Sequence, residues 1–96
     1  MLFALICTDK SASLELRLST RPDHVAYLKS LGDNLKFAGP FLGADEKPNG
    51  SLVVINAETR ASAEAIAAQD PYAKAGLFQS VEIRAWTWAL NNPEAK

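Results

Sequence analysis

The sequence predicts an α+β fold of the ferredoxin-like type, with the element order β-α-β-β-α-β, a four-stranded antiparallel sheet and both helices on one face. Two observations predict it. Four short apolar runs alternate with two longer segments of helical character, and 48% of the 96 residues are hydrophobic. The 22% of charged residues and the net charge of −1 are typical of a single globular domain, over residues 1–96.

The first strand and first helix come from the first third of the chain. Residues 2–8 are apolar at odd and even positions alike, which is typical of a strand covered on both faces. A helical stretch follows over residues 13–32, and Pro22 marks either a kink or the first helical position of its second half. Gly32 ends this helix.

A hairpin and a second helix follow. Residues 35–42 and 51–57 read as two strands, and the polar segment 43–50 connects them. The Ala-rich segment 61–69 predicts the second helix, with Thr59 available as its N-cap.

A proline interrupts the chain after the second helix. Pro71 disfavours helical geometry at Asp70, so residues 71–75 are expected to form a short separate turn that Gly76 ends. Residues 79–89 predict the last strand. Residues 91–96 are polar and predict a flexible tail.

Composition excludes several classes of protein. Ten basic and eleven acidic residues are interspersed, which argues against a nucleic-acid partner. One Cys rules out a disulfide scaffold and any Cys-based zinc site. It leaves the redox compartment undecided but compatible with the cytosol, and we expect a cytoplasmic protein. The longest apolar run, residues 2–7, is far shorter than the roughly 20 residues that span a bilayer, so no membrane association is expected.

The sheet face away from the helices is unexpectedly apolar. Trp86 and Trp88 face opposite to Val81 and Ile83 in the last strand, and the first and third strands are also apolar on both faces. Large exposed apolar patches mark interfaces or ligand sites. We therefore predict a homodimer packed sheet to sheet through a two-fold axis. The alternative is a misphased strand whose tryptophans cap a barrel edge.

His24 is the only histidine, and its place in the first helix is informative. At 100° per residue it shares one stripe with Tyr27, Leu28 and Leu31, so its imidazole is expected to face the sheet. Imidazole suits proton transfer near neutrality. Two interpretations stay open: a catalytic acid or base, and a core histidine satisfied by a backbone carbonyl.

Asp70 stands at the break after the second helix. Its carboxylate is expected to cap the short turn that begins at Pro71. It could also reach His24, fix the tautomer of the ring and raise its basicity.

Other residues carry weaker signals. Arg17 and Arg21 lie one helical turn apart and are either solvated charges or an anchor for an anionic substrate. Cys7 is expected to be a small buried residue. Gly39 and Pro40 within a strand, and the hydroxyls of Ser51 and Tyr72, are candidates for the lining of a pocket.

The residue pattern resembles the YciI-like (YCII-related) family over almost the whole chain. The resemblance is carried by the segments 17–28, 39–40, 50–51, 65–72, 75–78 and 81–86. Members are similar to muconolactone isomerase in forming dimeric α+β barrels. The resemblance implies an active-site His-Asp dyad at His24 and Asp70, in a cleft between sheet and helices. One branch of the family acts as a dehydrochlorinase on chlorinated hydroxylated rings.

We therefore expect a small enzyme of the lyase or isomerase kind that needs no metal or organic cofactor. His24 would transfer protons under the control of Asp70, on a small, anionic, cyclic or aromatic substrate. The expected pocket is lined by Arg17, Arg21, Gly39, Pro40, Ser51 and Tyr72. The alternative is a non-catalytic ligand-binding or dimerisation module with the same cleft.

Overall fold

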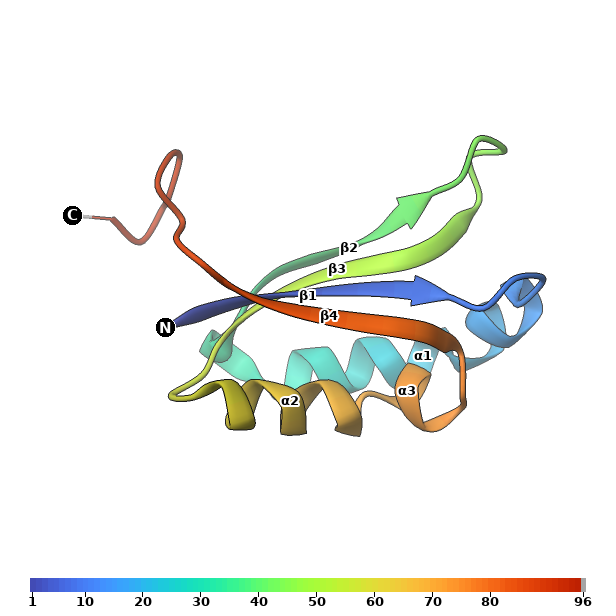
Figure 1. Cartoon of the computed structure of the whole chain (residues 1–96), viewed down its shortest axis with the longest axis horizontal. Coiled ribbons are helices and arrows are strands. Elements are labelled where there is room, and N and C mark those ends of the chain that lie inside the picture. Colours follow the sequence, from blue (N-terminus) through green and yellow to red (C-terminus); the bar gives the residue numbers. More distant parts are fainter. Residues whose placement is uncertain (96) are drawn as a thin grey trace.

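The expected ferredoxin-like fold is confirmed in the computed structural model, which describes residues 1–95. One antiparallel sheet has the strand order β2-β3-β1-β4, and the helices lie together on one of its faces (Figure 1). The elements are β1 (Leu2–Asp9), α1 (Leu14–Ser30), a 3-10 turn (Gly32–Asn34), β2 (Leu35–Leu42), β3 (Pro48–Asn56), α2 (Arg60–Gln69), α3 (Pro71–Lys74) and β4 (Phe78–Trp86).

Helix α1 runs through Pro22 without a break, so the prediction that this residue is the first position of a separate second half was wrong. Proline lacks an N–H group, so the carbonyl of Leu18 loses its usual helical partner, but a single missing bond does not end a 17-residue helix that packs on the sheet. The helix ends at Ser30, and Gly32 adopts a positive φ of 60° just beyond it.

Two strand boundaries differ from the predicted ones. Strand β3 begins at Pro48, because the hairpin closes early through the Gly43 amide, which donates to the Lys47 carbonyl at 2.9 Å. Strand β4 ends at Trp86, so the prediction of a strand to Ala89 was wrong. Its ladder partner β1 begins at Leu2, which pairs with Trp86, and residues 87–89 have no β1 residues left to pair with.

The predicted N-caps of the second helix and of the turn after it are both present. The Thr59 hydroxyl accepts the Ser62 amide at 3.1 Å at the start of α2. The Asp70 carboxylate accepts the Tyr72 amide at 2.9 Å at the start of α3, and Gly76 follows with a φ of 78°. Capping and a left-handed glycine thus hold the short α3 against the end of α2.

The core lies between the sheet and the helices. Phe3, Leu5 and Cys7 of β1 and Val53 and Ile55 of β3 are at most 4% exposed and face the helices. This confirms the alternation expected for both strands. Leu28 of α1 and Ala63 of α2 complete the buried cluster.

The opposite sheet face carries an aromatic cluster of Phe37, Trp86 and Trp88. The Phe37 ring meets both indoles edge-on, with ring centroids 5.7 Å and 4.9 Å apart. Val54 pairs with Phe37 in the ladder and is 1% exposed, although no helix covers it. Because the register places Trp86 opposite Leu2, on the face away from Ile83, the strand phase is as predicted and the misphased alternative is wrong.

The C-terminal segment leaves the sheet after β4 (Figure 1). Glu94 accepts a bond from the Lys36 ammonium at 2.9 Å, so the segment returns to β2. The flexible tail over residues 91–96 stays a prediction, and Lys96 lies outside the described residues. In residues 1–95 no helix has the length and apolar character needed to cross a membrane.

Among the glycines of the chain, Gly50 has the closest neighbouring atom and supplies a test of the fold. A Cβ at this residue would lie 2.5 Å from the Cys7 carbonyl oxygen, which is backbone and cannot move aside. We expect Gly50→Ala to lower the free energy of unfolding by about 1–3 kcal/mol. Urea unfolding followed by tryptophan fluorescence measures this.

Gly39→Ala is the matched control, because nothing lies within 4 Å of a Cβ added there. It should leave stability unchanged or raise it slightly. Equal losses of stability in both variants would contradict the packing described for Gly50.

Candidate functional site

His24 and Asp70 are in direct contact between α1 and the start of α3. His24 Nδ1 lies 2.8 Å from one carboxylate oxygen of Asp70 and 2.9 Å from the other. The two residues are 8% and 6% exposed. An ionised carboxylate only accepts hydrogen bonds, so Nδ1 supplies the proton of this contact. Whenever the ring carries a single proton, Nε2 therefore keeps its lone pair.

Asp70 holds its position through local structure as well as through His24. The same Oδ1 that contacts the imidazole also accepts the Tyr72 amide at 2.9 Å. The cap and the contact with His24 were two alternative roles for this side chain, and the geometry combines them. The break at Pro71 therefore orients the carboxylate that in turn orients the ring.

Tyr72 packs directly against the imidazole. Its ring stacks on His24 with centroids 3.9 Å apart and an angle of 18° between the planes. Phe78 meets the Tyr72 ring edge-on, with ring centroids 5.9 Å apart. Burial raises the pKa of Tyr72, although the nearby cations Arg17 and Arg21 lower it, so its hydroxyl remains a donor at neutral pH.

Arg17 is a buried cation with a defined set of partners. Its Nη1 lies 3.0 Å and 2.9 Å from the two Asp9 oxygens, and its Nη2 donates to Ser51 Oγ at 2.6 Å. The guanidinium carbon lies 4.7 Å from the centre of the Tyr72 ring. Arg17 is therefore not a solvated helix charge, because Asp9 neutralises it in a site only 4% exposed.

Asp9 is a site residue that the sequence reasoning missed. It ends β1, where a polar residue also fits a turn, and nothing in the linear pattern pairs it with a helix residue eight positions later. The one available signal is that a buried arginine requires an anionic partner.

A cavity of about 230 Å³ lies between α1 and the strands β2 and β3. Seven of the eight residues proposed from the sequence line it, namely Arg17, Arg21, His24, Gly39, Pro40, Ser51 and Tyr72. The eighth, Asp70, contacts the His24 ring at Nδ1. The apolar part of the wall includes Val25, Leu28 and Val53, which were not predicted as site residues.

Several polar groups remain available to a ligand in this cavity. In the part of the chain that the structure describes, every fully buried side-chain nitrogen or oxygen has a hydrogen-bond partner. His24 Nε2 and the Tyr72 hydroxyl have no partner within residues 1–95, so both reach accessible space, and both residues line the cavity. Arg21 forms no ion pair within the same residues and is exposed at the cavity.

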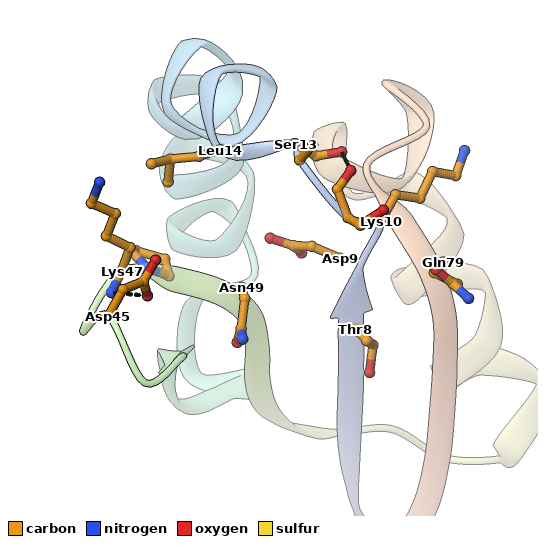
Figure 2. A pocket seen from close by; sticks show the side chains of 12 residues that line it. Thr8, Asp9, Lys10, Ser13, Leu14, Asp45, Lys47, Asn49 and Gln79 are labelled. Atoms are coloured by element: carbon orange, nitrogen blue, oxygen red, sulfur yellow. Dashed lines mark hydrogen bonds between the residues drawn. The ribbon is translucent and has the colours of Figure 1, made fainter.

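A second hollow, of about 400 Å³, lies on the other side of the Asp9–Arg17 pair. Figure 2 shows Asp9 pointing toward α1, while the side chains of Lys10 and Gln79 point away. His24 is not among the residues that line this second hollow. Across residues 1–95, no three His, Cys, Asp or Glu side chains gather so as to hold a metal ion.

Comparison with known proteins relates the chain to one family. The model of the YCII-related domain matches residues 1–87. Protein YciI of Escherichia coli is 38% identical over 92 residues, which cover 88% of this chain and 94% of that one. An uncharacterised protein of Haemophilus influenzae is 36% identical with the same coverage.

Solved structures agree with this relationship. A 5-chloro-2-hydroxyhydroquinone dehydrochlorinase of Burkholderia phenoliruptrix, in complex with 2,5-dihydroxybenzoquinone, is 33% identical and superposes with a TM-score of 0.85 over 91% of this chain and 94% of its own. A NIPSNAP family protein of Agrobacterium tumefaciens, 17% identical, has a TM-score of 0.59 over 98% of this chain and 97% of its own, which shows the shared fold alone.

Cys7 lies beside the site, and the reactivity of its thiol tests how deeply this residue is buried. The thiol is 4% exposed, and burial, Asp70 and Asp9 together raise its pKa from 9.0 to about 12. At pH 8 roughly one molecule in ten thousand then carries the thiolate, against about one in ten at the ordinary pKa. We expect Ellman's reagent at pH 8 to label the native protein far more slowly than the urea-unfolded chain. Rapid labelling of the folded protein at pH 8 would contradict this environment.

Proposed function

The chain belongs to the family of YCII-related domains, and from this membership and the His24–Asp70 contact we propose that it is a small-molecule enzyme of the lyase or isomerase type. The observation that carries the proposal is a buried imidazole whose Nδ1 is held by a carboxylate and whose Nε2 faces a cavity. This is the arrangement of a general base with its orienting partner.

The reaction begins at His24 Nε2. This nitrogen accepts a proton from the substrate, and Asp70 stabilises the imidazolium that forms. The electron pair left behind forms a new double bond as a leaving group departs, or the proton returns at another atom of the substrate in an isomerisation. Both courses require only proton transfer by a positioned side chain, so neither calls for a metal or an organic cofactor.

The size and charge of the cavity favour a one-ring substrate. A dry cavity of about 150 Å³ holds benzene, so about 230 Å³ admits a single ring with polar substituents. Val25, Leu28 and Val53 supply an apolar wall for the ring. Arg21, which has no ion-pair partner within residues 1–95, favours a negatively charged group. The related dehydrochlorinase, bound to 2,5-dihydroxybenzoquinone, supports the same class.

His24→Ala tests the proposed chemistry. We expect the purified protein to turn over 5-chloro-2-hydroxyhydroquinone or a related hydroxylated ring, and the variant to lose about 10²–10⁴-fold in kcat while still binding 2,5-dihydroxybenzoquinone. Asp70→Asn keeps an N-cap side chain, and we expect its kcat to lie between those of the wild type and His24→Ala. Chloride release and absorbance measure turnover, and calorimetry measures binding.

A ligand-binding module would give a different result. The wild type would then bind the quinone without turning over any ring, and His24→Ala would change affinity only. That outcome would overturn the enzymatic proposal in favour of the non-catalytic alternative.

We also propose a homodimer through the sheet face that bears no helix. This face presents the Phe37–Trp86–Trp88 cluster together with Phe41, which is 41% exposed. Leu52 and Ile6 are paired neighbours on the same face. A contiguous apolar surface of this kind on a small domain is favourably covered by an identical surface. We also propose a cytoplasmic location, with which the free thiol of Cys7 is compatible.

Trp86→Glu tests the dimer. Trp86 and Leu16 are both 37% exposed, but Leu16 lies on α1, away from the proposed interface. We expect a dimer for the wild type and for Leu16→Glu in sedimentation-velocity experiments, and a monomer for Trp86→Glu at the same concentration. Circular dichroism confirms that each variant is folded. A monomeric wild type, or a folded Trp86→Glu dimer, would overturn the proposal.

A further inference from the structure

The buried hydroxyl of Ser51 accepts a hydrogen bond but donates none within the described residues. The residue lies on β3, is 2% exposed, and faces the helices opposite Cys7 in the ladder. Its Oγ accepts the Nη2 of Arg17 at 2.6 Å. Within residues 1–95 its own O–H group donates to no acceptor, and the residue lines the cavity that His24 also lines.

The neighbours of Ser51 prepare this hydroxyl to donate. Both carboxylate oxygens of Asp9 hold Arg17, and the side chains of this ion pair are each 5% exposed. A hydroxyl that accepts a bond from a guanidinium is polarised, so its own proton becomes a stronger donor. Since Arg17 occupies the acceptor side of Oγ, the proton is left for a group in the cavity.

The arrangement does not suit a serine nucleophile. Such a residue needs a base within hydrogen-bond reach of its hydroxyl. In the described residues no hydrogen bond joins Ser51 to His24 Nε2, and the one side-chain bond of Ser51 is with Arg17, a cation that cannot accept a proton. Ser51 is therefore suited to donating a hydrogen bond and not to attack.

We propose that Ser51 is the hydrogen-bond donor for an ionised oxygen of the substrate, with Arg17 and Asp9 as positioning residues. This deepens the proposed function, on which it rests, and narrows the substrate class to phenols and enols that ionise at oxygen as His24 removes their proton. A preoriented donor stabilises the developing charge without reorganisation. The enzyme should therefore prefer ring substrates that carry a hydroxyl group over those that lack one.

4-Nitrophenol is a suitable probe, because its phenolate absorbs visible light and reports its own ionisation. We expect the wild type to lower the pKa of bound 4-nitrophenol below that of the free compound. Ser51→Ala should weaken phenolate binding by about tenfold or more, as is typical of one lost bond to a charged oxygen, and should reduce the pKa shift. Arg17→Met should produce part of the same loss.

Two further variants keep the test decisive. Ser19→Ala removes an exposed hydroxyl from α1 and should leave the probe unaffected. Ser51→Cys preserves shape with a weak donor, and it replaces Ser51→Ala in the comparison if circular dichroism shows that the alanine variant does not fold.

The outcomes separate the two proposals. The donor role would be overturned if the folded Ser51 variants bound 4-nitrophenol as tightly as the wild type does and shifted its pKa equally. The turnover test would then still decide the His24–Asp70 chemistry. If the wild type bound neither 4-nitrophenol nor 2,5-dihydroxybenzoquinone, the substrate class and the donor role would both be wrong.

Discussion

The buried carboxylate of Asp70 is the constraint on which the site depends. A charged group that is 6% exposed must have all of its strong partners in place, and Asp70 finds them in the Tyr72 amide and the His24 ring. The first partner begins α3 and the second lies 46 residues away on α1. One side chain thereby joins a local helix break to the packing of the two helical segments, and sets which imidazole nitrogen faces the cavity.

A second buried charge pair supports the first. Asp9 and Arg17 neutralise each other across β1 and α1, and Tyr72 lies in contact with both Arg17 and His24. Arg17 and His24 are therefore joined through the Tyr72 ring. Arg17 pairs with Asp9, His24 pairs with Asp70, and Tyr72 stacks on the His24 ring. Arg21 is then the exposed cation of the cavity, and it supplies the positive charge for the anionic substrate proposed above.

The strands contribute buried residues to both faces of the sheet. On one face, β3 alternates Ser51 with Val53 and Ile55, so that the site and the core share a single strand. On the other face, Val54 is 1% exposed beneath an aromatic cluster instead of a helix. Strands that are apolar on both faces are thus consistent with one face packed on helices and the other partly shielded by aromatic rings that remain available for a second copy.

The sequence by itself determined the order of the elements, the caps at Thr59 and Asp70 and the inward face of α1, because periodicity, proline and capping chemistry act over a few residues. It also pointed to seven residues that line the cavity, in part through family resemblance. Only the tertiary structure decided that Asp70 meets His24, that Asp9 neutralises Arg17, and that β4 ends at Trp86. These outcomes depend on strand register and helix packing between distant segments, and no local pattern encodes which partner a buried charge will find.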